Sequence, residues 1–122
     1  MTIQEFARRT GLSAHTLRYY EQIGLITAVS RTPAGHRRYG ERELEWVGFI
    51  QRLKATGMPL AQIQHYAQLR RAGQSSLTDR RQPLEAHAVQ LAEALAAQQA
   101  HLAALQQKIA WYCQQEKALD LE

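Results

Sequence analysis

The chain has 122 residues, enough for one domain and an extension, and a formal net charge of +4. It contains no apolar run of membrane-spanning length and no charged-then-apolar leader, so we expect a cytoplasmic protein with no membrane partner. Its single cysteine excludes an internal disulfide framework and an all-cysteine metal site within one chain.

The charge is divided unevenly along the chain. Residues 1–77 carry 11 Lys and Arg against 5 Asp and Glu, a balance of +6, whereas residues 78–122 carry 4 against 6, a balance of −2. Residues 1–77 are therefore expected to bind a polyanion, and residues 78–122 are expected to have a different function.

The first residues have the pattern of a helix-turn-helix. Ile3, Phe6 and Ala7 recur at helical spacing and give a first short helix an apolar face. Gly11 then breaks the pattern, because glycine readily takes the positive φ of a tight turn. Ser13 is a good N-cap for a second helix, so the sequence predicts two short helices joined at Gly11.

The second helix offers hydrogen-bond donors, a cation and an aromatic hydroxyl on its turn-proximal face. Such groups suit phosphate oxygens and base edges in a DNA major groove. Tyr20 is ambiguous, because it shares a face with the apolar Leu17. The candidate DNA-binding residues of this helix are Ser13, His15, Thr16, Arg18, Tyr19 and Tyr20.

A basic hairpin is predicted next. Residues 26–29 are apolar enough for a short strand, residues 31–35 have turn chemistry, and residues 36–39 form a basic, aromatic return strand. Such a hairpin would hold its cations beside the second helix, as a wing does; the alternative is a solvated surface loop. The candidate DNA-binding residues of this segment are Arg31, His36, Arg37 and Tyr39.

Residues 2 to about 70 resemble the DNA-binding domain of the MerR family of bacterial transcription regulators. The matching stretches are TGLSAHTLRYYEQIGLI, then GHRRY, then ERELEWVGFIQRLKATGMPLAQI. The resemblance implies a winged helix-turn-helix dimer that distorts promoter DNA and acts with RNA polymerase. It places Arg18 and Tyr19 on the DNA, and Arg37 and Tyr39 in the wing motif.

Two further helices should complete the first domain. A third is expected from Glu41 to a stop at Gly57, and a fourth from Pro59 to a stop at Gly73. Their predicted core-facing residues are Leu44, Trp46, Val47, Phe49, Ile50 and Leu53, then Leu60, Ile63, Tyr66 and Ala67. The aromatic residues among them could form a ligand cage, but the helical spacing favours a core role.

The last third of the chain follows the heptad rule of a coiled coil. Its seam alternates steps of four and three without a slip, and Gln98 is its polar member. The 77 residues before it cannot cover so long a helix, so we expect a homodimer; the antiparallel pairing is implied by the resemblance. Pro83 requires either an irregular first turn or a helix that begins at Pro83. The predicted seam is Leu84, Ala88, Leu91, Leu95, Gln98, Leu102, Leu105, Ile109 and Tyr112.

Cys113 is a candidate redox sensor, and the alternative is an inert small hydrophobe beside the seam. The ending KIAWY and the preceding DRR resemble the family branch that responds to aldehyde or nitrosative stress. Members of that branch often carry a cysteine in the third-helix region, where this chain has Gln51 and Arg52. The histidines form no close pair on one helical face, so no metal site is expected.

We therefore predict a mainly α protein with three parts: a winged helix-turn-helix DNA-binding domain at 1–77, a long dimerisation helix forming an antiparallel coiled coil at 78–118, and a short tail at 119–122. No catalytic constellation and no cofactor motif is present, so an enzyme is not expected. The predicted function is a sequence-specific transcriptional regulator that binds a two-fold promoter operator. The alternatives are an architectural DNA-bending protein and a coiled-coil adaptor that binds an acidic protein. The effector is unknown.

Overall fold

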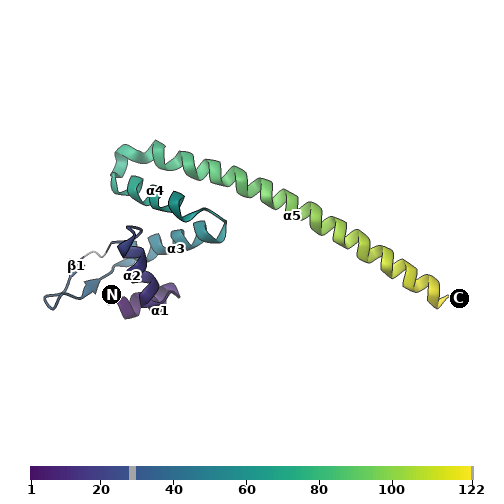
Figure 1. The fold of residues 1–122 in the computed structure, drawn as a ribbon, viewed down its shortest axis with the longest axis horizontal. Coiled ribbons are helices and arrows are strands. Elements are labelled where there is room, and N and C mark those ends of the chain that lie inside the picture. The colour runs from purple at the N-terminus through teal and green to yellow at the C-terminus, as the bar shows by residue number, and fades with distance from the viewer. Residues whose placement is uncertain (28–29, 122) are drawn as a thin grey trace. The chain divides into compact units, whose positions relative to one another are not determined.

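The computed structural model describes residues 1–27 and 30–121, without the side chain of Ser75. Its helices and strands follow one another along the chain (Figure 1) as α1 (Ile3–Thr10), α2 (Ala14–Gln22), β1 (Ser30–Arg31), β2 (Arg37–Arg38), α3 (Glu41–Ala55), α4 (Leu60–Arg71), a 3-10 turn (Gly73–Ser76) and α5 (Leu77–Asp120). The chain divides into two compact units, Met1–Leu84 and Glu85–Glu122. This mainly helical architecture, with a two-stranded wing and a long last helix, confirms the predicted fold class.

Local capping fixes the helix-turn-helix. The N–H of Gly11, at φ 76°, donates to the carbonyl of Ala7 and ends α1. Ser13 caps α2, because its Oγ accepts from the Thr16 N–H at 3.0 Å. Both roles were predicted, and both are confirmed.

The wing is the antiparallel hairpin β1–β2, with Ser30 opposite Arg38 and Arg31 opposite Arg37. Its loop closes at Thr32, whose N–H donates to the carbonyl of His36 at 2.7 Å. The predicted first strand at 26–29 was wrong at its start, since Ile26 is buried in the core rather than paired. Residues 28 and 29 lie outside the described residues.

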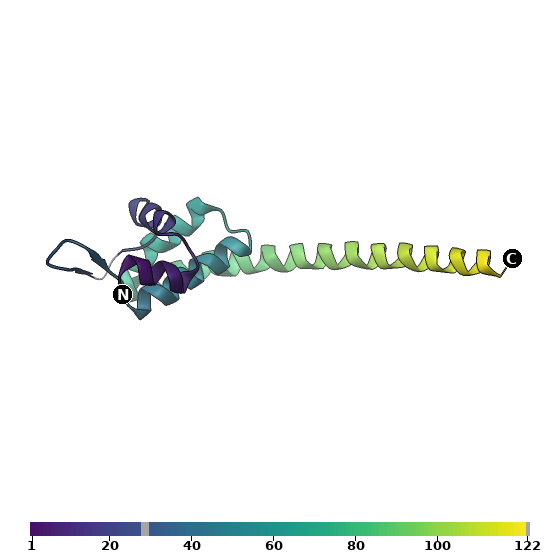
Figure 2. The same cartoon turned by 90° about the horizontal axis from the view of Figure 1, so that it is seen from below.

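The N-terminus is tied to the end of the hairpin. The amino group of Met1 donates to the carbonyl of Tyr39 at 2.5 Å, and the Tyr39 N–H donates to the carbonyl of Met1 at 2.8 Å. Figure 2 accordingly shows the N-terminal end of α1 beside the hairpin. The wing and the helix-turn-helix are thus joined at two places, this one and the α2 contacts described below.

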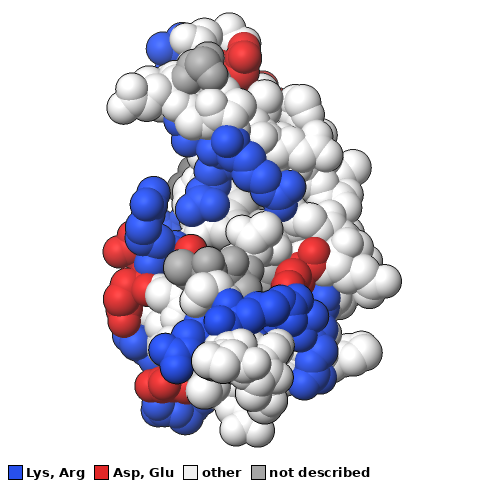
Figure 3. Space-filling model, turned by 90° about the vertical axis from the view of Figure 1, so that its left-hand side faces the viewer, with Lys and Arg blue, Asp and Glu red and all other residues white. Residues whose placement is uncertain are grey.

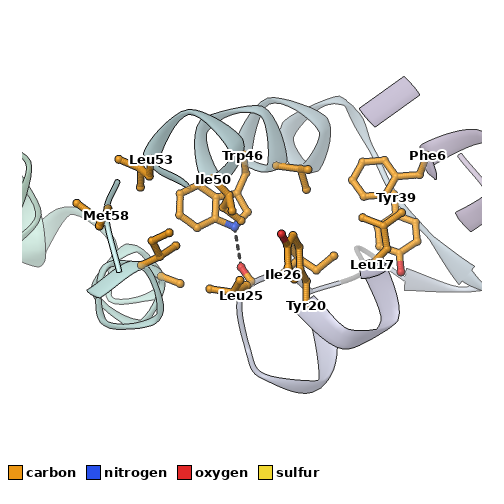
Figure 4. Packing of buried hydrophobic residues seen from close by; sticks show 13 residues of the cluster. Phe6, Leu17, Tyr20, Leu25, Ile26, Tyr39, Trp46, Ile50, Leu53 and Met58 are labelled. Atoms are coloured by element: carbon orange, nitrogen blue, oxygen red, sulfur yellow. Dashed lines mark hydrogen bonds between the residues drawn. The ribbon is translucent and has the colours of Figure 1, made fainter. Parts of the chain in front are cut away.

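One hydrophobic core supports these elements (Figure 4). The rings of Phe6 and Tyr39 stack with their centroids 4.4 Å apart. The Trp46 indole N–H donates to the carbonyl of Leu25 at 2.7 Å and anchors α3 to the segment after α2. Burying these side chains supplies the main stabilising term of the domain.

α3 and α4 largely follow the prediction. Trp46 is buried, and Phe49 and Tyr66 pack against it with ring centroids 5.7–6.3 Å apart, as a core role requires. Two details were wrong. Pro59 is the N-cap of α4 rather than its first residue, and Leu60 is 38% exposed and does not face the core.

α5 begins at Leu77 and runs through Pro83 without interruption. Neither predicted alternative was right, because the irregular turn lies before the helix, at Gly73–Ser76, and the helix starts ahead of the proline. Pro83 has no N–H, so one carbonyl in the preceding turn, that of Asp79, lacks its helical donor. None of the helices within residues 1–27 and 30–121 combines the length and hydrophobicity that a membrane span requires.

Candidate nucleic-acid interface

The exposed face of α2 carries three of the predicted contacts. His15, Arg18 and Tyr19 are exposed, and Tyr19 keeps 42% of its surface. Ser13 and Thr16 serve the helix cap, because the Ser13 hydroxyl donates to Thr16 Oγ1 at 2.9 Å in addition to capping the Thr16 N–H. The side chains able to reach a base or a phosphate are thus His15, Arg18 and Tyr19.

Tyr20 and Tyr39 differ from the other predicted contacts, because they are only 4% and 2% exposed. The Tyr20 hydroxyl accepts from Lys54 Nζ at 2.8 Å and ties α2 to α3. Tyr39 stacks on Phe6 under the wing. Both residues therefore hold the elements of the interface together, and their contact with DNA stays a prediction.

Glu21, which the sequence did not single out, connects α2 to the wing. Its Oε2 lies 2.5 Å from Arg37 Nε and forms an ion pair with that guanidinium group. The Tyr39 hydroxyl donates to the same oxygen at 3.3 Å, and Arg31 lies 3.9 Å from Oε1. Glu21 follows directly after Tyr20 in the LRYYE motif. Its position in the sequence does not indicate that it links α2 to the wing.

This arrangement changes the acidity of Tyr39. Burial, and then the charge and hydrogen bond of Glu21, raise the pKa of Tyr39 to about 12. The phenol therefore stays protonated at neutral pH and donates to the Glu21 carboxylate.

The remaining wing residues face solvent. Arg31, His36 and Arg38 are exposed, and Arg37 is half-buried. Arg31 also donates to the carbonyl of Gly35 at 3.1 Å, which stiffens the loop. Arg37 and Arg38 are neighbours in β2, where successive side chains point to opposite faces, and their different burial agrees with this alternation.

A hollow of about 770 Å³ lies between the start of α1, α2 and the wing. Arg18, His36, Arg37 and Arg38 line it together with Glu5. Lys and Arg side chains gather on the side of the molecule that carries the wing (Figure 3). Such a concave basic surface suits a polyanion backbone.

The other predicted sites belong mainly to α5 (Leu77–Asp120). Cys113 is an exposed free cysteine on α5. No group of three or more metal-ligating side chains gathers anywhere in the described part of the chain. Most of the predicted seam is exposed along the second unit, with Leu91 half-buried and Leu95, Leu102, Leu105, Ile109 and Tyr112 54–62% exposed.

Comparison with known proteins decides the family. A family model described as "MerR HTH family regulatory protein" matches residues 1–69, and a second, described as "MerR, DNA binding", matches residues 44–112. The chain belongs to the MerR family. It is therefore a DNA-binding transcriptional regulator, and its relatives are regulators rather than enzymes.

Individual MerR-family relatives agree over most of the chain. An uncharacterized HTH-type transcriptional regulator of Haemophilus influenzae is 34% identical over 118 residues, which are 97% of this chain and 87% of that protein. AdhR of Bacillus subtilis is 36% identical over 81 residues, 66% of this chain and 58% of AdhR. The structure of HiNmlR, a MerR family regulator lacking the sensor domain and bound to promoter DNA, has a TM-score of 0.82 at 34% identity. That match covers 97% of this chain and 93% of HiNmlR.

Proposed function

We propose that this MerR-family regulator binds a two-fold promoter operator as a homodimer and distorts it to control transcription by RNA polymerase. The observation that carries the proposal is the joining of α2 and the wing into one basic surface. His15, Arg18 and Tyr19 extend from α2, and Glu21 holds the wing beside them through Arg37. The similar HiNmlR is bound to promoter DNA, which supports the same partner here.

The α2 and wing residues would make two kinds of contact with DNA, one to phosphates and one to bases. Arg18, Arg31, Arg37 and Arg38 suit phosphate oxygens, because guanidinium groups bind them in bidentate fashion. His15, in the first turn of α2, and Tyr19, one turn further along the same helix, suit base edges in the major groove. The phosphate contacts would set affinity, and the base contacts would set sequence preference.

The second unit supports a homodimer. Leu95, Leu102, Leu105 and Ile109 are each more than half exposed and repeat at heptad spacing on one helix. A second copy of the same face would cover them, and the family resemblance favours an antiparallel pair. The dimer would then hold two α2 helices about one helical turn of DNA apart, roughly 34 Å. Because its partner is promoter DNA, we place the protein in the cytoplasm.

Footprinting on the protein's own upstream region tests the proposal. We expect a two-fold protected site, affinity that falls steeply with salt, and altered reactivity of the central base pairs. An architectural protein would bend DNA without changing transcription in a reconstituted polymerase assay. An adaptor for an acidic protein would show equal affinity for the operator and a scrambled duplex across the salt series.

A further inference from the structure

A second hollow, of about 290 Å³, lies on the first unit away from α2. Three helices each contribute a guanidinium group to it: Arg42 from α3, Arg70 from α4 and Arg80 from the first turns of α5. Glu45 also lines it, so three arginines and one glutamate leave a net lining charge of +2. We call this hollow the arginine pocket.

Aromatic rings form the other part of the lining. Trp46, Phe49 and Tyr66 pack against one another, and the Trp46 N–H is already used by the Leu25 carbonyl (Figure 4). The Arg70 guanidinium carbon lies 4.4 Å from the Trp46 ring centroid. A stacked guanidinium keeps its N–H groups in its own plane, where an acceptor can approach from the side.

The positive charge of the pocket is not matched within the described residues. No carboxylate there lies within 4.0 Å of any of the three guanidinium groups. Arg80 donates from one terminal nitrogen to the carbonyl of Gly73 at 3.1 Å, whereas its Nε is buried without an acceptor. Burial, followed by repulsion from Arg42, lowers the pKa of Arg70. Bringing cations together in this way is unfavourable unless an anion joins them.

We propose that the arginine pocket binds a carboxylate or phosphate group of a small molecule. The oxyanion would accept hydrogen bonds from Arg70 and Arg80 and lie within reach of Arg42, and the half-buried Phe49 and Tyr66 would contact an attached apolar or planar part. The volume suits a ligand at the small end of the range for protein pockets. The site is separate from the α2 and wing surface, so the proposal does not depend on DNA binding.

Occupancy would have a structural consequence within the first unit. Arg42, Arg70 and Arg80 lie on α3, α4 and the start of α5, and one bound anion would connect all three. The connection would join α3 and α4 to the first residues of α5, all within the first unit. The ligand would thus act as an effector without using the Cys113 thiol.

The test uses the full-length protein and three probes: inorganic phosphate, phenyl phosphate and benzoate. Trp111→Phe leaves Trp46 as the single tryptophan, and its fluorescence reports binding because its ring lines the pocket. Titrations at constant ionic strength, with chloride as the reference, give affinities, and thermal melts give the matching stabilisation. Arg42→Gln and Arg70→Gln are compared with Arg52→Gln, a matched control that removes an exposed arginine from the same α3 helix.

We expect saturable binding of at least one probe by the parent protein and by Arg52→Gln. Arg70→Gln should weaken it about tenfold or more, and Arg42→Gln by less, because Arg42 is exposed. Three results would each overturn the proposal: no probe signal beyond the chloride reference, equal affinities in all three variants, or a loss of promoter affinity in Arg42→Gln without any probe binding. The last result would assign the pocket to a DNA phosphate instead of a small molecule.

Discussion

The contact network of Glu21 leads to a quantitative prediction for Glu21→Gln, which keeps the side-chain shape and removes its charge. Glu21 is 20% exposed in its side chain and Arg37 is 33% exposed, so their ion pair is only partly screened and contributes about 1 kcal/mol. The Gln side chain still offers an oxygen to the Tyr39 hydroxyl, but a hydrogen bond to this neutral acceptor is about 1 kcal/mol weaker than one to the carboxylate. The 3.9 Å contact with the 55% exposed Arg31 adds little. We expect Glu21→Gln to lower the free energy of unfolding by about 2 kcal/mol.

The measurement is urea denaturation at pH 7, followed by Trp46 fluorescence in the Trp111→Phe background. Glu41→Gln is the matched control, because Glu41 also pairs with an arginine, Arg9, at 2.8 Å but is 70% exposed. It should cost less than about 0.5 kcal/mol. Equal destabilisation by the two substitutions would refute the assignment of Glu21 as the link between α2 and the wing.

The same substitution separates geometry from charge in DNA binding. Glu21→Gln raises the net charge by one, which by itself strengthens attraction to DNA. It also releases the wing from α2, which weakens any contact that needs both elements in place. We expect weaker binding to the operator and unchanged or stronger binding to scrambled duplex. Stronger binding to both duplexes would show that Glu21 acts only as a charge.

Four further outcomes follow from the seam, the α2 surface, the buried phenol and the thiol. Leu95→Asp should raise the dimer dissociation constant at least about 100-fold in sedimentation, because it buries an unpaired carboxylate; a stable folded monomer of the unmutated chain would contradict the seam itself. Arg18→Ala should weaken binding on all duplexes and lower the salt slope by about one per lost phosphate contact, whereas His15→Ala should alter base preference in a selection experiment. The raised pKa of Tyr39 means that its stability contribution is present below about pH 10 and is lost as the pH rises toward 12, so Tyr39→Phe should flatten the alkaline limb of a stability profile. Cys113→Ser should leave the reporter response to aldehydes and oxidants intact, and a lost response would assign sensing to the thiol.

The features that were predictable from the sequence are the ones decided by neighbouring residues. The turn at Gly11 and the cap at Ser13 depend on backbone preferences and contacts three or four residues away, which a sequence displays directly. The uninterrupted heptad pattern likewise matched a single helix, Leu77–Asp120. Pro83 misled the prediction of its start, because a proline within a few residues of a helix start costs less than one deep in its interior.

What the sequence could not show depends on contacts across the fold. Tyr39 was predicted as a wing contact because it belongs to the GHRRY motif, but the ring of Phe6, from α1, stacks on it. Glu21 was not singled out, because only the hairpin's return to α2 gives it Arg37 and Tyr39 as partners. Both cases depend on contacts between segments that are far apart in the sequence, which local periodicity does not determine.

Two groups of arginines differ in their partners, and the difference bears on function. Arg37 on the wing already has a carboxylate, Glu21, so a DNA phosphate must compete with it, but the ion pair also holds the guanidinium group in place. Arg42, Arg70 and Arg80 have no carboxylate within ion-pairing distance in the described chain, so an anion that reaches them does not compete with an acidic side chain. A guanidinium group held in place by a carboxylate suits recognition of DNA, in which position matters. Guanidinium groups without a carboxylate suit tight binding of a small anion. The DNA-facing surface and the proposed arginine pocket thus both use arginine, and they differ in that Glu21 pairs with Arg37 only on the DNA-facing surface.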